Sequence, residues 1–136
     1  MSYGLLVMSY EKITTMSERK IIIKEKNFAF ASRIVKLFKY LAQNKHEYVI
    51  GKQLLRSGTA VGALVREAQN TESTADFIHK LGIAQKECDE TIFWLELLKD
   101  NDFLTEKEFE SINQEGIELL KIIRSIIIST KQKNNS

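Results

Sequence analysis

The sequence predicts an all-α protein, specifically an antiparallel up-and-down four-helix bundle. Three observations predict this fold: apolar residues recur every three or four positions in four segments, the 136 residues include no proline and only six glycines, and short polar turns separate the segments. A chain of this length is expected to form one domain with its own core. We expect residues 21–130 to form the bundle, residues 1–20 a poorly ordered N-terminal extension, and residues 131–136 a frayed tail.

The first predicted helix starts near Asn27, a residue type that favours the N-cap, and ends near Asn44. Residues 21–24 are rich in isoleucine and fit either an extended lead-in or a first helical turn. Residues 16–20 resemble the start of a soluble protein, so both Met1 and Met16 are candidate start residues. The apolar stripe of this helix consists of Phe30, Ile34, Phe38 and Leu41.

The second predicted helix covers residues 47–70 and contains a cluster of small residues between Arg56 and Ala63. A glycine inside a helix costs about 1 kcal/mol relative to alanine, so Gly58 and Gly62 indicate close packing or a local break. We interpret the cluster as the point where a neighbouring helix approaches most closely. The stripe of this helix consists of Ile50, Leu54, Val61, Val65 and Ala68.

The third predicted helix runs from a cap at Ser73 or Thr74 to about Lys99, and residues 100–102 form a turn. The pattern Thr105-x-x-Glu108 predicts a capping box that starts the fourth helix. The third stripe contains Phe77, Leu81, Ala84, Cys88, Thr91, Leu95 and Leu98, and the fourth contains Phe109, Ile112, Gly116, Leu119, Ile123 and Ile126.

The last two helices carry more apolar residues than one stripe requires. We interpret this excess as a sign of self-association, and the alternative is a thick core within a single chain. The additional residues are Ile83, Ile92, Phe93 and Trp94 in the third helix, and Ile117, Leu120, Ile122, Ile127 and Ile128 in the fourth.

Three blocks of sequence resemble a known family. The blocks are FAFASRIVKL at 28–37, QLLRSGTAVGA at 53–63 followed by Glu67-Ala68, and DFIHKLGIAQKE at 76–87 followed by Glu90 and Trp94-Leu95. Their order and spacing resemble the bacterial four-helix-bundle family that includes the 23S ribosomal RNA intervening-sequence proteins, over about residues 20–130. The accessory variability proteins of diversity-generating retroelements are similar.

The resemblance implies an antiparallel bundle that assembles into a ring, which is five-membered in relatives. It also implies an association with RNA, DNA or a nucleic-acid enzyme. One position departs from the family pattern: an asparagine often follows the Gly-Ala pair, whereas this chain has Leu64 there. A polar contact made by that asparagine in relatives is therefore not carried over.

Charge is distributed unevenly along the chain. Residues 19–45 contain eight basic residues and one acidic residue, while residues 46–104 contain six basic and ten acidic residues. Clustered cations attract nucleic-acid phosphates, so we predict a nucleic-acid-binding face on the first helix. The alternative is a solvated face, or one that pairs with the acidic third helix of a neighbouring subunit. The candidate binding residues are Lys24, Lys26, Arg33, Lys36 and Lys39.

A second set of charged residues flanks apolar positions of the second and third helices. We predict that these residues form ion pairs between helices and set their register, rather than binding phosphate or catalysing a reaction. The set consists of Arg56, Arg66, Glu67, Asp76, Lys80, Glu87 and Glu90.

Catalytic and cofactor-dependent functions find little support in the sequence. The single cysteine, Cys88, lies on an apolar stripe, and the two histidines, His46 and His79, do not form the paired Glu-x-x-His pattern of di-iron bundles. Gly58 and Gly62 lack the spacing of a phosphate-binding loop. We expect no enzyme activity, no cofactor, no metal, no membrane span and a cytoplasmic location.

Two function hypotheses remain open from the sequence. The first is an oligomeric RNA- or DNA-binding accessory protein that uses the basic face of the first helix. The second is an assembly or scaffolding module that binds a protein partner without nucleic acid.

Overall fold

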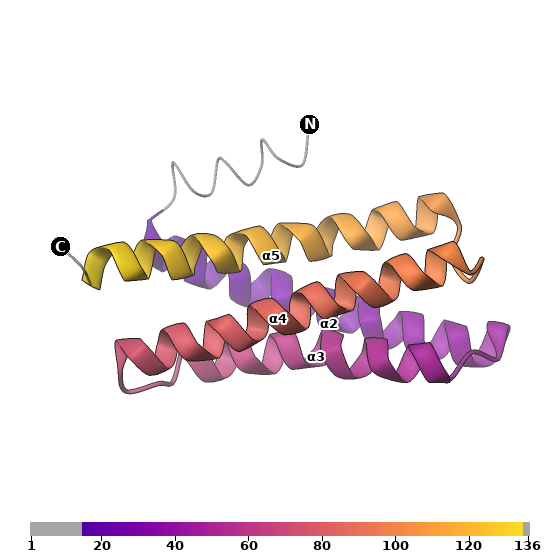
Figure 1. Ribbon diagram of the computed structural model, residues 1–136, viewed down its shortest axis with the longest axis horizontal. Helices are drawn as coiled ribbons and strands as arrows, with labels where there is room; N and C mark the ends of the chain where they lie inside the picture. The colour runs from indigo at the N-terminus through magenta and orange to yellow at the C-terminus, as the bar shows by residue number, and fades with distance from the viewer. Residues whose placement is uncertain (1–14, 135–136) are drawn as a thin grey trace.

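The computed structural model of the chain describes residues 15–134. These residues form four helices: α2 (Met16–Lys45), α3 (Val49–Ala68), α4 (Thr74–Asp100) and α5 (Glu106–Asn134). Figure 1 shows the helices side by side along the long axis, with short connections at alternating ends. Each helix packs against the next one along the chain, and α5 packs back against α2. The prediction of an all-α four-helix bundle is confirmed.

The predicted N-terminal extension (residues 1–20) and tail (residues 131–136) are only partly described by the structure. Residues 1–14 and 135–136 lie outside the described residues, so the predictions for the N-terminal extension and for the end of the tail concern mostly those segments. Residues 16–20 belong to α2, and residues 131–134 complete α5.

The predicted start of the first helix at Asn27 is wrong, because α2 begins at Met16. Thr15 is the N-cap: its Oγ1 accepts a hydrogen bond from the Glu18 amide at 3.1 Å, and Glu18 Oε2 accepts one from the Thr15 amide at 3.2 Å. This capping box satisfies amide groups at the helix end that have no partner inside the helix. Residues 21–24 are therefore helical, and Ile23 is buried.

Asn27 has a structural role inside α2 rather than at its end. The residue is only 2% exposed, and its Nδ2 donates a hydrogen bond to the carbonyl oxygen of Val61 in α3 at 3.3 Å. The polar side chain that suggested a cap thus links two neighbouring helices.

The turn between α2 and α3 is stabilised by two local devices. His46 adopts the left-handed conformation with φ 52° and ends α2, and its amide donates to the Leu41 carbonyl. The Glu47 carboxylate accepts hydrogen bonds from the amides of Ile50 at 3.0 Å and Gly51 at 2.8 Å. A negative charge at a helix N-terminus is favourable, so Glu47 replaces a short capping residue for α3.

The predicted starts of the last two helices are confirmed. Ser73 Oγ accepts a hydrogen bond from the Asp76 amide at 3.0 Å. Thr105 and Glu108 form the predicted capping box, with reciprocal side chain to amide hydrogen bonds of 3.1 Å and 2.9 Å.

The small-residue cluster of α3 is where α2 comes closest. A Cβ atom placed on Gly58 would lie 2.8 Å from Cγ2 and 2.9 Å from Cγ1 of Ile34. These distances are shorter than real Cβ contacts, so only glycine fits without a shift of Ile34. The close-packing interpretation is therefore confirmed at Gly58, whereas a Cβ atom on Gly62 would lie 3.9 Å from Ala31 Cβ, an ordinary contact.

Much of the apolar excess in α4 and α5 is buried within the chain. Ile92, Leu120, Ile122 and Ile127 are each at most 8% exposed. These residues therefore do not support self-association, because they are part of the core of the single chain. The exposed large hydrophobic residues among those described are Ile21, Phe28, Tyr48, Val49, Phe93 and Ile128.

Candidate nucleic-acid interface

A ladder of charged and polar residues joins α2 to α5. Arg19, Lys26 and Arg33 are spaced by seven residues, so they lie on one face of α2. Because α5 runs antiparallel to α2, residues on α5 with the same spacing face them in reverse order. The α5 residues that these three cations contact are Ser125 and Ser129, then Glu118, then Glu115 and Ser111.

Two of the five predicted nucleic-acid-binding residues are used inside this ladder. Lys26 Nζ contacts the Glu118 carboxylate, and Arg33 Nη1 lies 2.6 Å from Glu115 Oε1. Arg33 Nη2 also donates to Ser111 Oγ at 3.2 Å. Burial raises the pKa of the Glu118 carboxyl, even though the Lys26 ammonium lies against it. Lys26 and Arg33 therefore pair with acids of the same chain, and these acids lie on α5.

The other three predicted residues lie on the outward face of α2. Lys24, Lys36 and Lys39 are exposed, and none of them forms an ion pair with another residue of the range 15–134. From Lys24 to Lys39 the helix rises roughly 22 Å, at 1.5 Å per residue. Phe28 is 68% exposed, and Ile21 is 61% exposed. The outward face of α2 thus combines exposed positive charge with exposed apolar surface.

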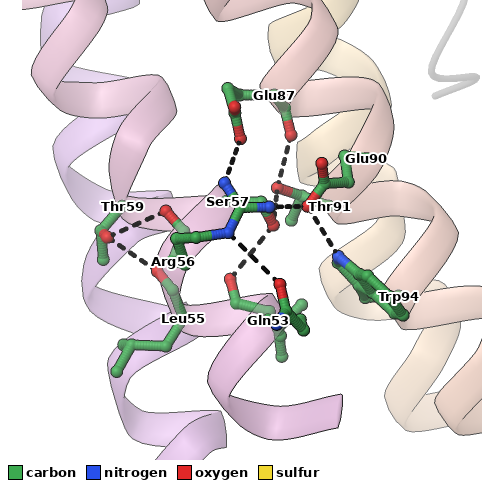
Figure 2. A network of polar contacts seen from close by, with 10 residues as sticks. Gln53, Leu55, Arg56, Ser57, Thr59, Glu87, Glu90, Thr91 and Trp94 are labelled. Atoms are coloured by element: carbon green, nitrogen blue, oxygen red, sulfur yellow. Dashed lines mark hydrogen bonds and ion pairs between the residues drawn. The ribbon is translucent and has the colours of Figure 1, made fainter.

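The α3/α4 surface carries a network around Arg56 (Figure 2). Arg56 Nη1 lies 3.1 Å from Glu87 Oε2, Nη2 pairs with the Glu90 carboxylate, and Nε donates to Gln53 Oε1 at 3.3 Å. Trp94 Nε1 donates to the same Glu90 oxygen at 3.0 Å. One guanidinium therefore connects two positions of α4 to α3.

Two buried hydroxyl groups lie close to this network in Figure 2. The Oγ atom of Ser57 and the Oγ1 atom of Thr91 are 2.9 Å apart, and both residues are fully buried. They fix α3 against α4 from the inside, while Arg56 is half-exposed. This arrangement is that of a structural ion pair rather than of a phosphate site.

The remaining residues of the predicted ion-pair set are less completely paired. Lys80 Nζ lies 3.7 Å from Glu67 Oε2, whereas Arg66 and Asp76 form no ion pair with any residue that the structure describes. Arg66 and Asp76 line a hollow of about 1050 Å³ between α2, α3 and the start of α4, together with Lys24 and Phe28.

The cysteine and the two histidines lie apart from one another. Cys88 is fully buried, its Sγ donates to the Gly116 carbonyl at 3.4 Å, and burial raises the pKa of its thiol to about 12. His46 and His79 are exposed and lie on different elements. Within residues 15–134, no three histidine, cysteine, aspartate or glutamate side chains come together as a metal site would require.

None of the described helices is both long enough and apolar enough to cross a membrane.

Sequence reasoning missed Arg19 and Glu118, which are both buried and charged. The available signal is the seven-residue spacing of Arg19, Lys26 and Arg33, matched by Ser111, Glu118 and Ser125. Matched spacing on two helices predicts facing residues only once the two helices are known to be antiparallel neighbours.

The family model described as 23S rRNA-intervening sequence protein matches residues 19–125. A crystal structure of a protein of unknown function, from the S23 ribosomal protein family of Bacteroides thetaiotaomicron VPI-5482, is similar with a TM-score of 0.80. The two sequences are 47% identical over 81% of this chain and 98% of that chain. No match is found among curated proteins.

Proposed function

Because the chain belongs to the 23S rRNA-intervening sequence protein family, we propose that it is a non-catalytic, oligomeric protein that binds RNA or DNA through the outward face of α2. The proposal includes a homopentameric ring and a cytoplasmic location. A nucleic-acid enzyme is the protein partner that the family resemblance implies for such a ring.

The observation that carries the proposal is the division of the α2 cations into two sets. Lys26 and Arg33 pair with glutamates of α5, whereas Lys24, Lys36 and Lys39 are exposed and form no ion pair with another residue of the range 15–134. Long flexible cations on one helix face bind phosphates without reading bases, and their affinity depends on salt. In a ring, this face would be repeated by every subunit and its potential would add up.

Phe28 supports the same surface. Its ring is exposed on α2 one turn after Lys24. An exposed aromatic ring between cations can stack on an unpaired base, which adds affinity for single strands. The Glu25 side chain is the acidic residue on this part of α2, and it leaves the local charge positive.

The direct test is the affinity of the purified protein for structured RNA and for single-stranded DNA, measured by fluorescence anisotropy. Three phosphate contacts imply a fall in affinity between roughly 50 and 200 mM salt of about 20-fold for a single strand and about 40-fold for a duplex. The triple variant Lys24→Glu, Lys36→Glu and Lys39→Glu is expected to lose binding and keep the oligomer.

The matched control is Lys86→Glu, which reverses an exposed lysine on α4. This control is expected to bind nearly as the wild type does. Absence of binding at about 50 mM salt, where phosphate contacts are strongest, would refute the proposal. Unchanged binding by the triple variant would show that another surface is responsible. A monomeric mass by light scattering would remove the ring from the proposal.

The second candidate is a scaffolding ring that binds a protein partner without nucleic acid. It is favoured by exposed apolar residues away from the α2 lysines: Val49 is 77% exposed and Phe93 is 53% exposed. The anisotropy experiment separates the two candidates, because a scaffold shows no salt-dependent affinity for RNA or DNA.

A further inference from the structure

The α2/α5 ladder contains one cation with no acidic partner. Arg19 is 8% exposed, and its Nη1 donates to Ser125 Oγ at 2.5 Å and to Ser129 Oγ at 3.2 Å. Its Nε has no hydrogen-bond partner among residues 15–134. Across the described part of the chain, no carboxylate forms an ion pair with Arg19.

The other two cations of the ladder show what is missing. Lys26 and Arg33 each pair with a glutamate of α5, although both are more exposed than Arg19. At the level of Arg19 the corresponding α5 position, seven residues after Glu118, is Ser125. A buried charge without a counter-ion is expensive, because water no longer solvates it and two neutral hydroxyls replace little of that solvation.

The surface beside Arg19 is hollowed and positively charged. The hollow has a volume of about 330 Å³, and a glutamate or aspartate is not among the described residues that line it. Each serine hydroxyl that accepts from Arg19 keeps its own hydrogen to donate. Thr130, one residue beyond Ser129, instead donates to the Ile126 carbonyl of its own helix. The lining residues are Arg19, Lys121, Arg124, Ser125, Ile128 and Ser129.

We infer that this hollow binds a phosphate group. The lining supplies the guanidinium groups of Arg19 and Arg124 and two hydroxyl donors, which exceeds what the two oxygens and single charge of a carboxylate can use. A phosphate monoester carries a charge near −2 and three acceptor oxygens, and a guanidinium fork matches its geometry. The bound group would supply the counter-ion that Arg19 lacks.

The site is separate from the outward face of α2, and the inference does not rest on nucleic-acid binding. Arg19 is on the face of α2 that contacts α5, whereas Lys24, Lys36 and Lys39 point to solvent. The phosphate has two possible sources, which are inorganic phosphate and the terminal phosphate of a nucleotide or nucleic-acid strand.

Inorganic phosphate is the first probe, used with the full chain. Thermal unfolding is followed with increasing phosphate and, at matched ionic strength, with sodium chloride. A ligand that binds only the folded state raises the midpoint in proportion to the logarithm of its concentration. We expect phosphate to raise the midpoint above the chloride reference, and phosphorus NMR to show a broadened phosphate signal in the presence of the protein.

Variants assign the effect to the hollow. Arg19→Gln is expected to abolish the response to phosphate. Because Arg19 is buried and its variant can fail to fold, the exposed Arg124→Gln is the second variant, with an expected several-fold weaker response. Lys86→Gln, on α4, is the charge control and should respond as the wild type does.

Uridine 5′-monophosphate, with uridine as the control that lacks the phosphate group, distinguishes a terminal phosphate from inorganic phosphate as the ligand. Stronger stabilisation by the monophosphate than by inorganic phosphate supports a terminal phosphate as the ligand, and equal stabilisation supports free phosphate. Equal effects of phosphate and chloride on the wild type would overturn the inference. An undiminished response of both Arg124→Gln and a folded Arg19→Gln would also overturn it.

Discussion

Helix α2 meets its two neighbours in different ways. Against α3 it packs by shape, because Ile34 fills the space that the missing side chain of Gly58 leaves. Against α5 it is joined by the ladder of Arg19, Lys26 and Arg33. A shape-fitted interface is sensitive to a single added methyl group, whereas a charged interface is sensitive to the removal of one partner and tolerates the replacement of both.

The largest effect is expected from Gly58→Val. Its Cβ would lie 2.8 Å from Ile34 Cγ2, and its two methyl groups add further overlap. Overpacking of a core costs typically 1–3 kcal/mol, so we expect a loss of about 3 kcal/mol in the free energy of unfolding. Urea unfolding followed by circular dichroism measures it.

The matched control for Gly58→Val is Gly82→Ala in α4. Apart from the chain neighbours and the backbone of α4 itself, no atom of the described residues lies within 4 Å of a Cβ placed there, so the alanine meets no obstacle. Alanine is the better helix former, and we expect a gain of up to about 1 kcal/mol. If Gly58→Val and Gly82→Ala lost similar amounts of unfolding free energy, the close approach of α2 to Gly58 would not be the cause of the loss.

The next effect is expected from Lys26→Met in the charged interface. The variant leaves the Glu118 carboxylate, whose side chain is 9% exposed, without its cation. A buried group deprived of its partner costs about 1–3 kcal/mol, so we expect a loss of about 2 kcal/mol in the free energy of unfolding.

The double variant Lys26→Met with Glu118→Leu tests the cause of that loss. Replacing both partners of a buried pair by apolar residues is often neutral, so the double variant should recover most of the stability. If the double variant lost as much unfolding free energy as the two single variants added together, the ion pair would not be the cause of the loss in Lys26→Met.

The two interfaces of α2 also differ in how far the sequence predicts them. The contact with α3 is predictable, because the glycines of α3 and the stripe of Phe30, Ile34 and Leu41 are visible as patterns within single segments. The start of α2 was also within reach: Thr15-x-x-Glu18 is the same pattern that predicts the start of α5 at Thr105. The isoleucines at 21–23 obscured it, since β-branched residues favour strands as well.

The charged interface is less predictable for a physical reason. Whether Lys26 faces solvent or a glutamate depends on the rotation of α2 about its axis and on which helix lies beside it. Periodicity gives the apolar direction of one helix but not the identity of the residues across the interface. The sequence pattern groups Lys26 and Arg33 with Lys24, Lys36 and Lys39, whereas the structure pairs the first two with glutamates of α5 and leaves the other three exposed.

A smaller effect is expected for the exposed end of the ladder. The Arg33 and Glu115 side chains are 38% and 42% exposed, and ion pairs in such positions contribute roughly 0.2–1 kcal/mol. A double-mutant cycle with Arg33→Ala and Glu115→Ala should give a coupling of about 0.5 kcal/mol that declines as salt is added. A coupling that exceeds the one between Lys26 and Glu118 would reverse the order of burial and strength along the ladder.

The smallest effect concerns the pH dependence of the same interface. Burial raises the pKa of the Glu118 carboxyl above its ordinary value of 4.5, so the folded protein holds this proton to a higher pH than the unfolded chain does. The contribution of Glu118 to stability is therefore greatest below pH 4.5 and declines as the pH rises through the raised pKa. Glu118→Gln has no such proton, so in urea unfolding the wild type should lose stability relative to this variant as the pH rises from 4.5 through the raised pKa. If the wild type instead gained stability relative to Glu118→Gln as the pH rises, the Lys26 ammonium would stabilise the Glu118 carboxylate by more than burial destabilises it. The ion pair would then make a net favourable contribution to the interface between α2 and α5.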